Sequence, residues 1–170
     1  PGEIVHATRV LSSDKKDFTR YDRLSLEVHG DSSWAGGLNP GQGKVSFGLR
    51  LGRDQGNRDS KDYYEVRLHI DTTTDLDPAH EALWRRNSFS VKISDLTGLK
   101  NDPLYRAFTG RAISQSAWHE GRGDSSLTLS IVGDPNLGAI DWMRLVIYVD
   151  SGATTRQHGE LRVNDLRLEG

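Results

Sequence analysis

The chain has 170 residues with 22 basic and 24 acidic side chains, which give a formal net charge of −2. This near-neutral balance provides no long-range attraction to nucleic acid or to an anionic membrane surface. The absence of cysteine excludes disulfides, thiolate metal sites and a cysteine nucleophile. The length suits one domain that buries enough apolar surface to fold alone.

The chain begins at Pro1 without a methionine or an apolar leader, and it contains no apolar run of the length that a membrane helix needs. We therefore expect it to be a piece excised from a larger protein, or a processed chain.

Alternation of apolar and polar residues predicts half-buried strands along most of the chain. The alternation is weak in a first strand around residues 4–11. The clearer strands carry apolar residues two positions apart: Leu24, Leu26 and Val28; Val45, Phe47, Leu49 and Leu51; Tyr64, Val66, Leu68 and Ile70; Phe89, Val91 and Ile93; Leu127, Leu129 and Ile131. Polar residues of the opposite parity, including His29 and His69, predict one solvated face of an antiparallel sheet.

Two C-terminal strands depart from simple alternation. From Trp142 to Val149 both parities are largely apolar, so we expect this strand to be covered on both faces near the middle of a sheet. In the closing strand, the inward residues Leu161 and Val163 have odd numbers, whereas the inward residues Leu166 and Leu168 have even numbers. This slip at the Asn-Asp pair 164–165 predicts a β-bulge.

Helix signals are confined to the connections. Asp77-Pro78 and Asp102-Pro103 each place a capping carboxylate before a first-turn proline, which predicts a short helical turn. Together with about eight or nine strands, these signals predict an all-β fold: residues 1–170 form a single two-sheet antiparallel β-sandwich of jelly-roll type, like galactose-binding and carbohydrate-binding modules. An eight-stranded membrane barrel is the alternative, and the long connections and missing aromatic girdles disfavour it.

No residue pattern in the sequence indicates catalysis. The histidines lack zinc-ligand spacing, and no local pattern pairs two carboxylates across a cleft. A nucleophile elbow, a phosphate-binding glycine loop and a dinucleotide fingerprint are all missing. We therefore expect no enzymatic activity, no catalytic residue and no required cofactor.

The remaining candidate site residues concern ligands rather than catalysis. Trp34 in a glycine-rich loop and Trp118 could stack on sugar rings if they are exposed, whereas Trp84 is expected to anchor into the core. In jelly-roll carbohydrate modules the last strand often contributes a carboxylate to a calcium ion, which makes Glu3 and Asp165 calcium candidates. The favoured interpretation of Asp165 is a bulge residue that bonds to local backbone.

An ordered set of short motifs extends from residue 21 to residue 168. The motifs are Tyr21-Asp22-Arg23-Leu24; Phe47-Gly48-Leu49-Arg50-Leu51-Gly52-Arg53-Asp54; Asp62-Tyr63-Tyr64-Glu65-Val66; Trp84 ahead of Val91 and Ile93; Gly133-Asp134-Pro135-Asn136-Leu137; and Gly159-Glu160-Leu161-Arg162-Val163-Asn164-Asp165-Leu166-Arg167-Leu168. Their order and spacing resemble a segment of the SprA family, gliding-motility cell-surface proteins that form the outer-membrane translocon of the type IX secretion system. A longer, more charged loop at 54–63, Trp84-Arg85 in place of a Trp-Pro pair, and an insertion around Trp34 mark a distant relative.

The resemblance implies a cell-envelope domain, associated with the outer membrane or the cell surface, that sits in or over a large β-barrel without crossing the membrane itself. Its partners would be translocon proteins or their substrates, and it would have a structural or protein-interaction role without catalysis. The alternative is a carbohydrate-binding module of jelly-roll fold, whose ligand would be a glycan.

Overall fold

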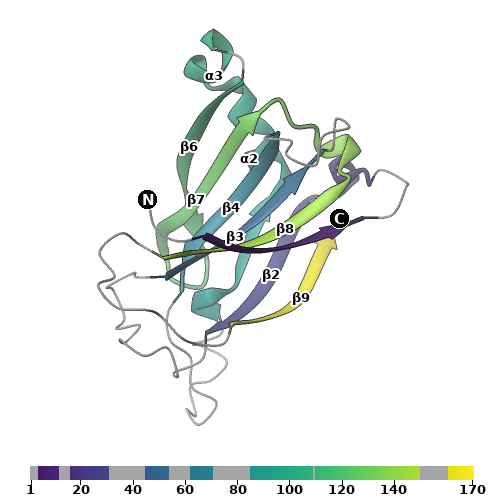
Figure 1. Cartoon of the computed structure of the whole chain (residues 1–170). Helices are drawn as coiled ribbons and strands as arrows, with labels where there is room; N and C mark the ends of the chain where they lie inside the picture. The colour runs from purple at the N-terminus through teal and green to yellow at the C-terminus, as the bar shows by residue number, and fades with distance from the viewer. Residues whose placement is uncertain are drawn as a thin grey trace.

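The computed structural model describes residues 4–11, 16–30, 45–53, 62–70, 85–108, 110–149 and 161–170. Two antiparallel sheets pack face to face over an apolar core, which confirms the predicted two-sheet sandwich (Figure 1). The larger sheet holds six strands in the spatial order β1 (Ile4–Val10), β8 (Trp142–Val149), β3 (Val45–Gly52), β4 (Tyr63–His69), β7 (Asp124–Gly133) and β6 (Gly110–His119). The smaller sheet holds three strands in the order β5 (Phe89–Lys92), β2 (Arg23–Gly30) and β9 (Leu161–Glu169).

Short helical segments extend the layer of the smaller sheet. They are α2 (Ile93–Gly98), η2 (Leu99–Asn101) and α3 (Pro103–Ala107), with η1 (Phe18–Arg20) and η3 (Leu137–Ala139) in other connections. The first three contact β6 and β7 and bury Leu96, Leu99 and Tyr105. They therefore cover inward-facing side chains that a three-stranded sheet is too narrow to reach. Across the described segments, no helix has the length and apolarity that crossing a membrane requires.

The predicted cap of α3 is confirmed. The Asp102 carboxylate accepts a hydrogen bond from the backbone N–H of Leu104 at 2.7 Å, and Pro103 occupies the first turn. The other predicted cap, at Asp77-Pro78, lies outside the described residues.

The alternating apolar residues of β2, β3, β4 and β7 are buried and face the core, as predicted. Each such aliphatic or aromatic side chain contributes about 1.5–3 kcal/mol on burial. Strand β8 lies between β1 and β3, and Val146 on its outer face is fully buried, so the expectation of cover on both faces holds there.

Three sequence predictions need correction. Ile93 begins α2 and is not the last residue of a strand. Strand β6 is missing from the predicted strands, because small and polar residues occupy both of its faces and hide the alternation. His29 was expected to be solvated but is only 2% exposed. Alternation identifies the side of the sheet on which a residue lies, not whether other segments cover that side.

The predicted bulge in the closing strand is present. Ser25 pairs with Arg167 and Glu27 pairs with Asn164, so β9 contains one more residue than β2 over this interval. Asp165 takes up the extra position with a φ of 58°, in the left-handed region. Beyond the bulge Leu168 packs against the core, whereas Leu166 is 40% exposed, which corrects its predicted inward position.

The left-handed backbone at residue 165 can be tested by substitution. Asp165→Val should lower the free energy of unfolding by about 1–2 kcal/mol, because a β-branched residue is strained at positive φ. Asp165→Gly removes the same carboxylate without that strain and should stay within about 1 kcal/mol of the parent chain. Urea denaturation measures both. Equal stability of the two variants would contradict the bulge geometry.

Candidate functional site

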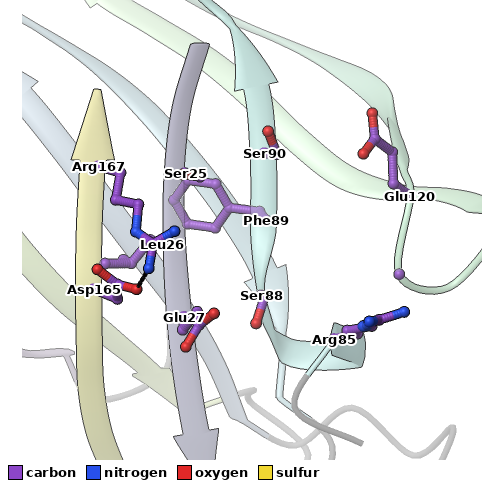
Figure 2. Close-up of a pocket in the computed structure, with 11 residues that line it drawn as sticks. Ser25, Leu26, Glu27, Arg85, Ser88, Phe89, Ser90, Glu120, Asp165 and Arg167 are labelled. Atoms are coloured by element: carbon purple, nitrogen blue, oxygen red, sulfur yellow. Dashed lines mark hydrogen bonds and ion pairs between the residues drawn. The ribbon is translucent and has the colours of Figure 1, made fainter. Parts of the chain in front are cut away.

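A polar groove of about 360 Å³ lies on the outer face of the smaller sheet (Figure 2). All three strands of this sheet and the turn between β6 and β7 contribute to it. Its lining residues are Ser25, Leu26, Glu27, Arg85, Ser88, Phe89, Ser90, Glu120, Gly121, Asp165 and Arg167. Strand alternation explains part of this composition, because Ser25 and Glu27 of β2 and Ser90 of β5 have the parity opposite to the core residues.

Ion pairs occupy both sides of the polar groove. On β9, Arg167 pairs with Asp165 across the bulge, as Figure 2 shows. On the opposite side, Arg23 pairs with Glu120 at 2.6 Å and donates to the Ser90 hydroxyl at 2.9 Å. The groove thus presents hydroxyl, carboxylate and guanidinium groups that can exchange hydrogen bonds with a polar ligand.

The predicted sugar-stacking residues do not meet in this groove. Trp118 is 60% exposed on β6 and is not among the lining residues. Trp34 and Trp84 lie outside the described residues. Phe89 supplies an aromatic ring to the described lining, but it is buried in the core cluster. The described part of the groove therefore offers hydrogen bonds without an exposed stacking platform.

The calcium hypothesis stays a prediction. Asp165 lies at the groove with its carboxylate paired to Arg167, a partner that the expectation of local backbone bonding missed. Glu3 is outside the described residues. Among the described residues, no three histidine or carboxylate side chains gather as a metal ion would require.

A second group of side chains occupies the outer face of the larger sheet. We call it the aromatic–arginine cluster. Its members come from the adjacent strands β3, β4 and β8, and they are Arg50, Tyr63, Glu65, Arg67, Trp142, Arg144 and Tyr148. The register places Arg50 directly opposite both Glu65 and Arg144, which brings the three strands' outward side chains together.

Glu65 is the anchor of the aromatic–arginine cluster. Its side chain is 6% exposed, and it accepts hydrogen bonds from the Arg50 guanidinium and from the Tyr148 hydroxyl, the latter at 2.6 Å. Burial opposes the charge on Arg50, but the hydrogen bond and negative charge of Glu65 outweigh it and raise the Arg50 pKa. Burial and the neighbouring Glu65 carboxylate raise the pKa of Tyr148. The network thus keeps Arg50 charged and Tyr148 protonated at neutral pH.

The arginines of the cluster lie over aromatic rings. The Arg50 guanidinium carbon is 4.4 Å from the centre of the Tyr63 ring, and that of Arg67 is 4.7 Å from the centre of the Tyr148 ring. The Trp142 ring lies directly against Gly52, where an added Cβ would be 1.9 Å from a ring carbon. A side chain at residue 52 would therefore displace the Trp142 ring from its position.

Sequence reasoning did not find the aromatic–arginine cluster. The sequence does contain a signal for it: aromatic and charged residues occupy the outward-facing positions of three strands. Strands β3 and β8 are about ninety residues apart in the chain, however, so only the spatial strand order joins them.

Comparison with known proteins gives no family assignment. No family model matches the chain, and no curated protein matches it. Among solved structures, the chain is similar to the tailspike protein gp49 of Acinetobacter baumannii bacteriophage Fri1, a capsular polysaccharide depolymerase, with 13% identity and a TM-score of 0.25. That match covers 92% of this chain and 19% of the tailspike chain.

Loss of the Glu65 carboxylate should be costly. Glu65→Ala leaves the largely buried Arg50 guanidinium without its counter-charge, and we expect the free energy of unfolding to fall by about 3–5 kcal/mol. Glu65→Gln retains an acceptor and should lose less. Arg20→Ala, which removes an exposed ion pair with Asp17, is the control and should cost less than about 1 kcal/mol. A similarly small loss in Glu65→Ala would show that the cluster adds little to stability.

Buried His119, beside the groove, predicts a pH dependence of stability. Burial lowers the pKa of His119 below its ordinary value of 6.5, and the Arg122 charge lowers it further. Its Nδ1 accepts a hydrogen bond from the Arg122 backbone N–H at 3.0 Å. As the pH falls below 6.5, the unfolded chain gains a proton at this residue before the folded chain does. The free energy of unfolding should therefore decrease as the pH falls from 6.5 to the pKa of His119 in the folded chain.

The midpoints of urea denaturation at about pH 7.5 and about pH 5.5 measure this loss of stability. These pH values are chosen because aspartates with lowered pKa values titrate in a more acidic range. His119→Gln cannot titrate, so its midpoint should change less between the two pH values. An equal change in both proteins would assign the pH dependence to other groups.

Proposed function

We propose that this chain is a non-enzymatic structural and protein-interaction domain of a SprA-like outer-membrane translocon, serving type IX secretion and gliding motility. The observation that carries the proposal is the aromatic–arginine cluster on the outer face of the larger sheet. Tyrosine, tryptophan and arginine are the residues that most often dominate the binding energy of protein interfaces.

The cluster is suited to binding because its side chains are held by contacts within the domain. Arg50 is fixed by Glu65 and by the Tyr63 ring, and Arg67 lies over Tyr148. Groups that are already ordered lose little side-chain entropy when a partner binds. Three arginines stand against one glutamate in the cluster, so its charge favours a partner surface that carries carboxylates.

The resemblance of the motifs between residues 21 and 168 supports the setting of the proposal. It implies a domain of the cell envelope, associated with the outer membrane or the cell surface. The partners would then be translocon components or the proteins that pass through them. In that role the domain acts through shape and surface contacts and needs neither a catalytic residue nor a cofactor.

A carbohydrate-binding module is the second candidate, favoured by the polar groove. Its serines, carboxylates and arginines provide the hydrogen-bonding groups that sugar hydroxyls use. The described groove has no exposed aromatic platform, and this ranks the candidate second.

Binding to purified translocon components by biolayer interferometry tests the proposal. The parent chain should bind the barrel protein or a periplasmic subunit, and Arg67→Ala/Arg144→Ala should weaken that binding about tenfold or more, the level of an interface hot spot. The control Arg20→Ala, away from the cluster, should bind as the parent does.

Two results would overturn the proposal. One is the absence of binding to every component. The other is binding that the double variant leaves unchanged. If a glycan panel instead quenches tryptophan fluorescence, and Glu27→Ala in the polar groove abolishes the quenching, the carbohydrate-binding alternative replaces it.

A further inference from the structure

Strand β6 is an edge strand without charge or proline along its centre. Helix α3 contacts it, and the Gln115 side chain donates a hydrogen bond to the Asp102 carboxylate at 2.9 Å. Within the described residues, β6 pairs with β7 alone and ends the six-stranded sheet. It is ten residues long, and no charged residue occurs between Ala112 and Trp118. An edge strand presents a row of backbone donors and acceptors that a further strand can use, and natural proteins usually block such an edge with charge, proline or short length.

Two of the other sheet edges carry such protection. Strand β5 has four residues, and β9 carries several charged side chains along its length. Strand β1 has one charged residue, Arg9, as β6 has Arg111, but it is seven residues long and β6 is ten. Strand β6 differs from these because Ser114, Gln115 and Ser116 are all exposed and uncharged.

Two irregularities limit the open edge. The pairing of β6 with β7 shifts register between Gly110 and Ile113 and again between Ala117 and His119. The regular part of the strand is therefore residues 113–117. Irregularities at both ends fix the register of an incoming strand and oppose extended, fibre-like addition.

The sequence of this edge is complementary to itself in the antiparallel direction. With a two-fold axis at Gln115, Ser114 of one copy lies opposite Ser116 of the other, and Ile113 lies opposite Ala117. The same axis brings Ala112 of one copy toward Trp118 of the other, just outside the regular residues 113–117. The small Ala117 thus meets the larger Ile113, and no like charges oppose each other between residues 112 and 118.

Trp118 adds a reason for a partner at this edge. Its side chain is 60% exposed, the largest exposed fraction among the described large apolar residues. In the antiparallel pairing, the small Ala112 of the second copy leaves room for this ring. A two-fold axis uses the same surface on both copies, so the contact closes after two chains.

We infer that two copies of this chain pair through β6, antiparallel about Gln115, so that their six-stranded sheets join into one continuous sheet. This contact uses an edge of the sheet and not the aromatic–arginine cluster. It goes beyond the proposed function and does not depend on it.

Sedimentation velocity on the 170-residue chain tests the inference through a charge swap. The parent chain should show a concentration-dependent dimer of twice its 18.9 kDa mass. Ser114→Lys/Ser116→Lys should be monomeric, because each new lysine faces a lysine of the second copy. Ser114→Glu/Ser116→Glu should also be monomeric. An equimolar mixture of the two variants should restore the dimer, because every new pair is then oppositely charged.

Two further variants sharpen the test. Trp118→Ala should raise the dimer dissociation constant about tenfold or more. Asn164→Lys, which adds a lysine at the β9 edge, should leave the dimer unchanged, and circular dichroism confirms that each variant is folded. A parent chain that stays monomeric to millimolar concentration would overturn the inference. So would a dimer that survives both charged double variants, or a mixture that fails to re-form it.

Discussion

Burial of apolar side chains between two sheets of unequal width is the constraint on which this structure depends. Leu24 and Leu26 of the smaller sheet and Phe47 and Leu49 of the larger one are almost completely buried. A three-stranded sheet cannot cover six strands, and the segment α2–η2–α3 completes the second layer over β6 and β7. The connection after β5 therefore supplies, through its helical turns, apolar side chains that the three-stranded sheet lacks.

The unequal widths of the two sheets also determine where the outer-face side chains gather. The larger sheet has a broad outer face, and three of its inner strands, β8, β3 and β4, carry the buried and half-buried side chains of the aromatic–arginine cluster. The smaller sheet leaves a narrower outer face, which holds the polar groove. Strand β6, at the end of the wide sheet, has an open edge. Three different surfaces thus follow from one packing arrangement, and each suits a different kind of contact.

Sequence reasoning predicted the sandwich and its bulge because both depend on local alternation. The parity change after Val163 located the bulge within a residue of Asp165. It missed β6, whose small and polar residues show no clear period, and it placed His29 in solvent although its side chain is buried. The aromatic–arginine cluster was out of reach, because Arg50 and Tyr148 become neighbours only through the strand order. Local pattern predicts elements, whereas sites built from several strands require the topology.

Native-state hydrogen exchange tests most directly whether the two unequal sheets share one core. The account predicts that amides of β2 in the smaller sheet and of β3, β4 and β8 in the larger sheet exchange only through one global unfolding reaction, with the same free energy and the same dependence on denaturant. If β2 and β9 instead exchanged as a separate unit, at a free energy well below that of the larger sheet, the shared core would be contradicted.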